Sequence, residues 1–198
     1  MLSETLPARS DDVDKLDVSA AYIHRIFSQY SQNTAYQTFE VWGIPYKNVI
    51  AQFGPKTDQP IYVIGAHYDS YKGLSGADDN ASGVAGLLEL ARLLSTHTLT
   101  RQVQLVAYAL EEPPYFRTDD MGSFHHAKQL KEHNITVALM LSLEMIGYFS
   151  DDANSQTFPL PFLDQIYPNT GNFIALVSAF EYFQDLNSYD KCMTSGRS

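Results

Sequence analysis

The chain has 198 residues, of which 44% are apolar and 18% are charged. This length suffices for one domain with a sizeable core, and 13 Tyr and 11 Phe argue against a disordered chain. A net charge of -10 would be repelled by nucleic-acid phosphates and anionic lipid, so we expect neither as a partner. We expect a chain soluble as it stands, because no apolar run approaches the roughly 20 residues that span a bilayer and residues 1–20 lack a signal-peptide core. A secreted or membrane-anchored precursor stays open, as do the compartment and the oligomeric state.

The predicted elements alternate between strands and helices. In chain order they are a helix over 14–30, strands over 46–53 and 61–67, a helix over 83–94, a strand over 103–110, a helix over 122–133, and strands over 137–143 and 173–177. Strands separated by helices of ten or more residues predict βαβ units. We therefore expect an α/β fold of three layers, with a mostly parallel twisted central sheet flanked by helices.

The first predicted helix is amphipathic. Its apolar positions are Leu16, Val18, Ala21, Ile23 and Ile26. At the other end of the chain, residues 179–198 carry no clean helix or strand signal and include Cys192, the one cysteine, so no internal disulfide can form. We expect a single domain over 1–198 whose C-terminal part is incomplete.

Acidic residues and one histidine recur at the predicted strand ends. They are His67 after the strand 61–67, Asp78 and Asp79 before the helix 83–94, Glu111 and Glu112 after the strand 103–110, and Glu144 after the strand 137–143. The carboxyl ends of parallel strands meet at one edge of a sheet, where open α/β folds bind ligands. We therefore expect these side chains to converge on one site.

Carboxylates gathered in this way repel one another unless a cation lies between them. One histidine with several carboxylates suits Zn²⁺, with Mn²⁺ or Co²⁺ as alternatives. Glu111 and Glu112 point to different sides of a strand end, so one can hold metal while its neighbour acts as a general base toward a metal-activated water. Asp69 lies two residues beyond His67 and can accept a hydrogen bond from the imidazole.

Four segments in order resemble the motifs of M28 family zinc aminopeptidases. They are GAHYDS at 65–70, GADDNASGVAGLLELARLL at 76–94, ALEEPPY at 109–115 and SLEMIGYF at 142–149, within a motif core of 46–149. The resemblance implies a zinc-exopeptidase-like fold, peptide substrates and two zinc ions per site in the intact family, with one or two here.

The resemblance also implies a role for each site residue. His67 and Glu144 would bind one zinc, Asp79 would bridge two, Glu112 would bind the second, Glu111 would be the general base and Asp69 would support His67. Asp79 takes the bridging role because it stands two residues before Ala81-Ser82-Gly83, which leaves Asp78 as a turn residue. The resemblance further implies a cis peptide bond between Asp79 and Asn80.

Two features depart from the family pattern. The position of Glu144 is usually Asp, and no histidine follows His133, although the family's last ligand is a downstream histidine. We interpret this as truncation before that ligand, with a natural one-metal or inactive variant as the alternative. The other histidines are interpreted as surface or cap residues: His24, His97, His125, His126 and His133.

These observations favour hydrolysis of a peptide bond at or near an N-terminus. The first alternative is a glutaminyl cyclase-like acyltransferase that uses a single zinc. The second is a metal-binding scaffold without catalysis, which the missing histidine favours and Glu111 disfavours.

Overall fold

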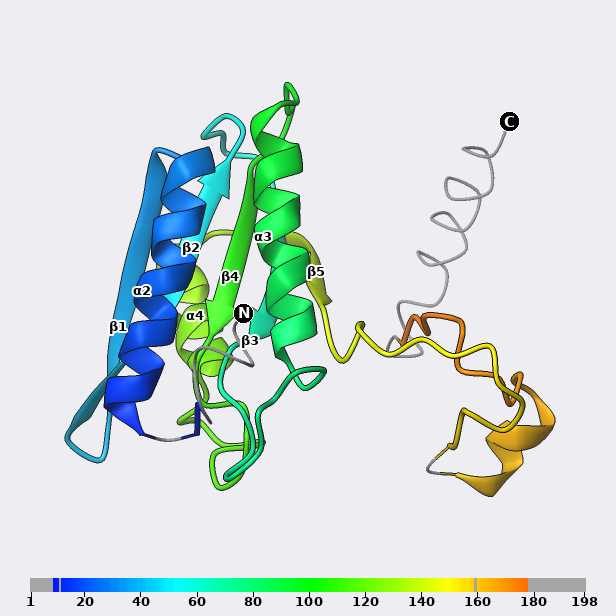
Figure 1. Ribbon diagram of the computed structural model, residues 1–198. Coiled ribbons are helices and arrows are strands. Elements are labelled where there is room, and N and C mark those ends of the chain that lie inside the picture. The colour runs from blue at the N-terminus through cyan, green and yellow to red at the C-terminus, as the bar shows by residue number, and fades with distance from the viewer. Residues whose placement is uncertain (1–8, 11, 159, 178–198) are drawn as a thin grey trace. The chain divides into compact units, whose positions relative to one another are not determined.

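The computed structural model describes residues 9–10, 12–158 and 160–177 (Figure 1). The chain divides into two compact units, Met1–Tyr148 and Phe149–Ser198. The tail 179–198, predicted to be weakly structured, lies outside the described residues, and a single domain over 1–198 stays a prediction.

The first unit is built on one five-stranded sheet. Its strands are β1 (Asn33–Val41), β2 (Ile44–Phe53), β3 (Ile61–His67), β4 (Val103–Tyr108) and β5 (Val137–Ser142), in the order β1-β2-β4-β3-β5. Strand β3 pairs in parallel with both β4 and β5, whereas β2 pairs antiparallel with β1 and β4. The α/β class is confirmed, and the sheet is mixed, with its parallel half formed by β4, β3 and β5.

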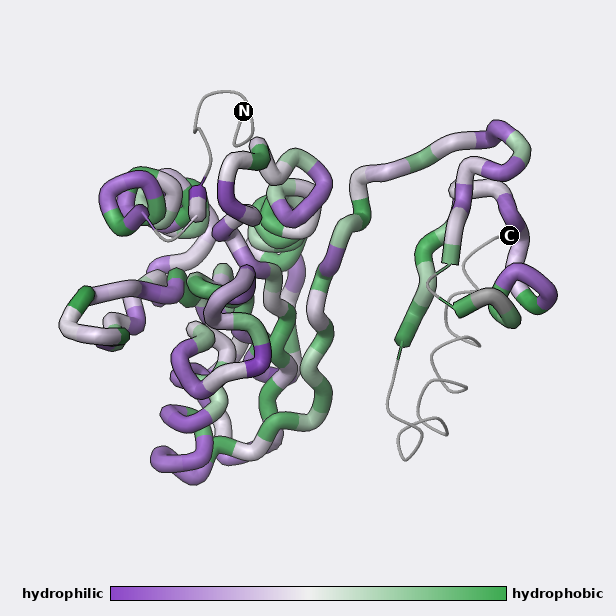
Figure 2. The backbone as a smooth tube through the Cα atoms, turned by 90° about the horizontal axis from the view of Figure 1, so that it is seen from below, coloured by the Kyte–Doolittle hydropathy of each residue, from purple (hydrophilic) through white to green (hydrophobic). Residues whose placement is uncertain are grey.

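Helices cover both faces of the sheet and make three layers (Figure 1). Helices α2 (Val13–Tyr30) and α3 (Ala81–Ser95) pack on one face, and α4 (Gly122–Glu132) packs on the other. The larger apolar core lies under α2 and α3, and a smaller one lies under α4. Figure 2 shows hydrophobic stretches along the strands of this unit, whereas hydrophilic stretches lie in its loops and along its helices.

Strand β1 was not predicted from the sequence, because most of its side chains are exposed and only Phe39 and Val41 are buried. A two-residue turn, Trp42 and Gly43, joins it to β2 with φ values of 53° and 80°. Both values lie in the left-handed region, as the tightest hairpin turns require. The predicted strand over 173–177 is wrong, since those residues form no strand.

The buried face of α2 differs from the predicted one. Leu16, Ala20, Ile23 and Phe27 are fully buried, at the spacing of one helix face, whereas Val18 is 56% exposed. The helix therefore presents to the core a stripe that includes small Ala20, and it turns β-branched Val18 to solvent.

No helix among the described residues is both long enough and apolar enough to cross a bilayer.

His126 lies in the core, so its prediction as a surface or cap residue is wrong. It is 2% exposed, and its Nδ1 and Nε2 lie 3.0 Å from the Tyr108 hydroxyl and from Oε1 of Gln104 respectively. Nε2 therefore donates to the Gln104 carbonyl, and Nδ1 accepts from Tyr108. Burial lowers the pKa of His126 from 6.5 to about 4 because it disfavours the charged ring.

The described part of the second unit consists mainly of turns, bends and irregular segments. It contains a 3-10 helix, η1 (Pro161–Gln165). The Ser150 amide donates to the Gly171 carbonyl and the Gln156 amide donates to the Asn169 carbonyl, so segments near 150 and 170 run side by side.

We expect His126 to make the protein sensitive to acid. Its folded pKa of about 4 lies below the ordinary 6.5, so the unfolded chain binds the extra proton between these values. The stability that neutral His126 provides is present above about pH 6.5 and is lost as the pH falls toward 4. Between about pH 7.5 and pH 4.5, the wild-type free energy of unfolding should fall by about 2–3 kcal/mol more than that of His126→Gln. Urea unfolding at the two pH values measures the difference. The control is His133→Gln, at an exposed position. An equal fall in the free energy of unfolding in wild type and His126→Gln would contradict the assignment of this acid sensitivity to His126.

Candidate metal centre

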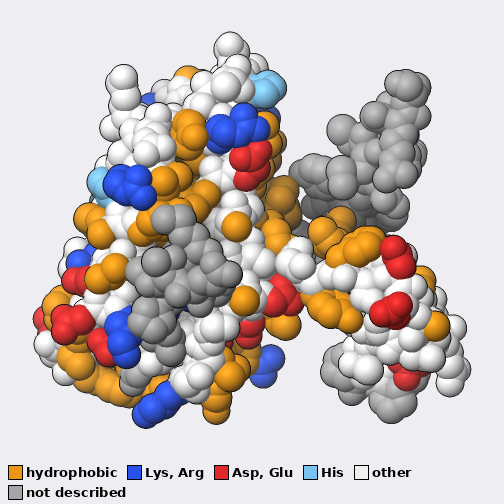
Figure 3. Space-filling model, viewed as in Figure 1, with side chains coloured by type: hydrophobic (Ala, Val, Ile, Leu, Met, Phe, Trp, Pro, Cys, Tyr) orange, Lys and Arg blue, Asp and Glu red, His pale blue; other side chains and the backbone are white. Residues whose placement is uncertain are grey.

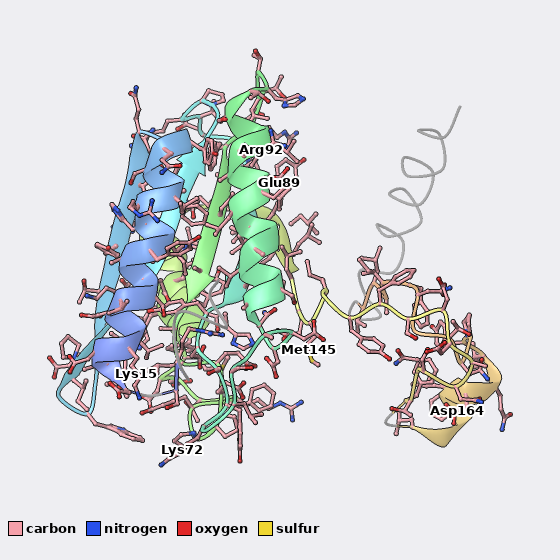
Figure 4. The ribbon with its side chains drawn as sticks, viewed as in Figure 1. Lys15, Lys72, Glu89, Arg92, Met145 and Asp164 are labelled. Carbon is pink, nitrogen blue, oxygen red and sulfur yellow. The ribbon has the colours of Figure 1, made fainter. Side chains whose placement is uncertain are left out.

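The carboxyl ends of β3, β4 and β5 lie at one edge of the sheet, the lower edge of the first unit in Figure 1. His67 is the last residue of β3, and Glu111 and Glu144 follow the ends of β4 and β5 by three and two residues. In Figure 4, Lys72 in the loop after β3 and Met145 after β5 lie toward the same edge. Three strand ends therefore deliver side chains to one place.

Nε2 of His67 lies at the centre of these side chains. It is 3.1 Å from Oδ1 of Asp79, 3.4 Å from Oε1 of Glu144 and 3.8 Å from Oε2 of Glu111. Potential ligand atoms lie within 4.8 Å of one another in two groups, His67 with Asp79 and Glu144, and His67 with Glu111 and Glu112. Asp79 and Glu112 also line one cavity of about 250 Å³. The structure thus brings together all the residues that the sequence suggested as ligands or base.

Asp69 connects two of the converging loops. It is 2% exposed, and its Oδ1 lies 3.3 Å from Nδ1 of His67. Its Oδ2 accepts hydrogen bonds from the backbone amides of Glu111 and Glu112, both at 2.9 Å. One buried carboxylate therefore lies against the imidazole at ion-pair distance, without the hydrogen bond that the sequence suggested, and fixes the turn that carries both glutamates.

Asn80 connects another pair of loops, a role that its N-cap position did not reveal. It is fully buried, and its Oδ1 accepts from the amide of Gly83, which caps α3, and from the amide of Met145. Its Nδ2 donates to the Leu143 carbonyl at 2.8 Å and to Oε2 of Glu144 at 3.3 Å. The preceding peptide bond, Asp79–Asn80, is cis, as the resemblance implied.

Asp78 has a structural role. Its Oδ1 accepts from the Gly147 amide at 2.8 Å, and its carbonyl accepts from the hydroxyl of Ser82 at 2.7 Å. That hydroxyl in turn accepts from the Ile146 amide at 3.0 Å. Asp78 therefore joins the loop before α3 to the segment after β5 and leaves Asp79 to face His67.

Two bulky residues beside the site have left-handed backbone. Leu110, just before Glu111, has φ of 60°, and Met145, just after Glu144, has φ of 46°. This conformation is uncommon for non-glycine residues, and such residues concentrate at functional sites. Each lies next to a glutamate of the cluster.

The electrostatics of the cluster reflect crowded carboxylates. Burial lowers the pKa of His67, but Asp69 and Glu144 outweigh it and raise that pKa to about 11. Burial, followed by the negative charges of Asp69, Glu144 and Glu112, raises the pKa of Glu111 to about 7 despite the opposing effect of His67.

Asp79 and Glu112 show the same trend. Their pKa values are raised chiefly by burial, with further increases from neighbouring carboxylates. Oε1 of Glu112 is buried and has no hydrogen-bond partner among the described residues. A divalent cation would neutralise such a cluster, and an imidazole with carboxylates is a donor set that fits Zn²⁺.

The fold is that of zinc-exopeptidase-like structures, and the site gathers residue types that suit a zinc ion. The model of peptidase family M28 matches residues 48–178, and the chain belongs to that family. In sequence it is similar to the protein YfbL of Escherichia coli, at 47% identity over 196 residues that cover 94% of this chain and 58% of that protein. It is also similar to a probable zinc metalloprotease of Pyrenophora teres, at 33% identity over 118 residues that cover 55% of this chain and 23% of that protein.

Solved structures share the fold. The LapA aminopeptidase of Legionella pneumophila has a TM-score of 0.65 at 25% identity, with 77% of this chain and 42% of that chain covered. The glutaminyl cyclase of Porphyromonas gingivalis has a TM-score of 0.64 at 22% identity, with 77% and 58% covered. The chain thus spans 58% of the length of YfbL and smaller or equal shares of the other proteins named.

We expect Asp69→Asn to weaken zinc binding. Asp69 uses one oxygen for two backbone amides and the other for His67, and an amide group must place an NH₂ at one of these positions. Loss of such a supporting partner lowers metal affinity by about 10–100-fold. Competition with a chromophoric chelator measures the zinc dissociation constant.

Asp78→Asn is the matched control for this test. Its side-chain oxygen can still accept from Gly147, so zinc affinity should stay within about twofold of wild type. Equal zinc affinities for the two variants would contradict the role of Asp69 in supporting the metal centre.

Proposed function

We propose that this chain carries the metal-binding and catalytic core of an M28 peptidase that removes residues from the N-terminus of peptides. One observation supports this most. Carboxylate oxygens of Asp79 and Glu144 lie close to Nε2 of His67, and Glu111 lies beside them. Membership of family M28 and the likeness to an aminopeptidase of Legionella pneumophila agree with it.

His67, Asp79 and Glu144 would hold one zinc ion. Asp79 and Glu112, which line a common cavity, would contribute to a second where two are bound. Zinc, when bound, supplies a Lewis acid that lowers the pKa of a water molecule and polarises a carbonyl group.

Glu111 would act as the general base. Its Oε2 is 3.8 Å from Nε2 of His67, and its side chain is 28% exposed. With His67 and Glu144 it lines a cavity of about 230 Å³, which gives the carboxylate access to reacting groups. Glu111 would accept a proton from the attacking water and deliver it to the leaving amine, while Asp69 fixes the backbone from which it projects.

The charge of the site favours a substrate with a free amino terminus. Asp79, Glu111, Glu112 and Glu144 surround a single histidine, so any carboxylate not engaged by metal attracts a protonated amine. This acidic edge does not extend into a uniformly charged surface: the face in Figure 3 carries acidic and basic side chains interspersed.

A glutaminyl cyclase-like acyl transfer is the second candidate. The group His67, Asp79 and Glu144 alone suffices for one ion, and the fold resembles that of a glutaminyl cyclase from Porphyromonas gingivalis. A metal-binding scaffold is the third. The three differ in product: a free amino acid, a pyroglutamyl peptide, or none.

Glu111→Gln should separate catalysis from metal binding. In zinc-loaded protein assayed on aminoacyl-p-nitroanilides, kcat should fall by about 10²–10⁴-fold, because the amide cannot accept a proton. The zinc content should match that of wild type. Glu132→Gln, at the exposed end of α4, is the control and should leave kcat unchanged.

Other outcomes would redirect the assignment. Unaltered kcat in Glu111→Gln would contradict its role as base. Pyroglutamate formation from glutaminyl peptides by wild type would favour the cyclase, and zinc uptake without turnover would favour the scaffold.

A further inference from the structure

Arg9 is a buried charged residue remote in sequence from the metal centre. It is 1% exposed, and a charge at that depth is costly unless its hydrogen bonds are satisfied. Three guanidinium nitrogens donate to backbone carbonyls: Nε to Tyr68 at 2.8 Å, Nη1 to Ser75 at 3.0 Å and Nη2 to Gly76 at 2.9 Å. The backbone of Arg9 adds two bonds to Ser70, one to its hydroxyl and one from its amide.

The acceptors of Arg9 lie at both ends of one loop. Tyr68 stands between His67 and Asp69, and Gly76 stands three residues before Asp79. One planar side chain therefore joins the point where the chain leaves His67 to the point where it approaches Asp79. The fork of donors on a guanidinium suits this task, since a lysine ammonium offers a single nitrogen.

The packing around Gly76 shows how closely this region is fitted. Its φ is +57°, and a Cβ added there would lie 2.7 Å from Nη2 of Arg9 and 2.5 Å from the carbonyl oxygen of Asp79. The Gly76 carbonyl also accepts from the amide of Ala81, the first residue of α3. Arg9 thus contacts the turn that sets where Asp79 enters the site.

The positive charge of Arg9 also acts on Asp69. Burial lowers the pKa of Arg9, and the attraction of Asp69 opposes that effect. Asp69 in turn contacts His67 and accepts from the amides of Glu111 and Glu112, so Arg9 is also coupled electrostatically to the carboxylate that connects these loops.

We propose that Arg9 is a positioning residue of the metal centre, holding both ends of the loop 68–76 so that His67 and Asp79 reach the same cation. The inference rests on the proposed metal centre, and it places a determinant of that centre some sixty residues upstream of His67, in the segment before α2. Within the described part of the chain, Arg9 acts on the site through the backbone carbonyls of the loop.

The test compares Arg9→Ala and Arg9→Lys with a destabilised control. Phe27→Leu, in the last turn of α2, truncates a fully buried side chain outside the loop and lowers stability without touching the site. Each full-length variant is titrated with Zn²⁺ against a chelator, its visible spectrum is recorded with Co²⁺, and its melting temperature is measured.

We expect Arg9→Ala to lose at least about tenfold in zinc affinity and to show an altered Co²⁺ spectrum. Arg9→Lys should show a smaller loss, because one of the three carbonyl contacts can be kept. Millimolar guanidinium should restore part of the zinc affinity of Arg9→Ala. Phe27→Leu should melt earlier but keep the wild-type zinc affinity and spectrum.

Unchanged zinc affinity and an unchanged Co²⁺ spectrum in both Arg9 variants would overturn the positioning role while leaving the proposed function intact. Equal weakening in Phe27→Leu would also overturn it, because it would show a general effect of stability. A wild-type protein that takes up no zinc would overturn the proposed function itself, and this inference with it.

Discussion

The mutual repulsion of the carboxylates around His67 is the constraint on which the rest of this structure depends. Parallel strands β3, β4 and β5 bring Asp79, Glu111 and Glu144 to within 4 Å of one imidazole nitrogen, where burial raises the pKa of Glu111 and Asp79. Without a cation, such a cluster is stable only if some of its carboxyl groups are protonated. A divalent cation replaces those protons, so folding and metal binding are coupled in the account proposed here.

The cluster is held from outside by three buried polar side chains. Asp69 joins the end of β3 to the turn after β4, Asn80 joins the start of α3 to the segment after β5, and Arg9 closes the loop between His67 and Asp79. Each of these side chains forms hydrogen bonds mainly with backbone groups. These bonds fix the positions of the loops without a bound ligand. Preorganisation of this kind is what a site needs to hold repelling groups at metal-binding distance.

The parallel half of the fold was readable from the sequence, because strands such as 61–67 are short apolar runs bounded by polar loops. The hairpin of β1 and β2 was not, since β1 is an exposed edge strand and its turn uses Trp42 in a conformation that sequence rarely signals. The sequence did indicate that β2 runs opposite to β3. The link between them, residues 54–60, has seven residues and is too short for a parallel crossover. His126 was misplaced because its burial depends on Gln104 and Tyr108 of another element.

In the site, the convergence of the residues carrying the motifs could be predicted, with Asp69 beside His67, but the supporting roles of Asn80 and Arg9 could not. Arg9 bonds to carbonyls about 60 residues away, and backbone carbonyls leave no pattern in a sequence. The central claim is that His67, Asp79 and Glu144 share one cation, and a crystal of the zinc-loaded protein tests it most directly. An anomalous difference map at the zinc edge should show a peak within about 2.0–2.2 Å of His67 Nε2 and of carboxylate oxygens of Asp79 and Glu144. A peak elsewhere, or none at this position in crystals that contain zinc, would contradict it.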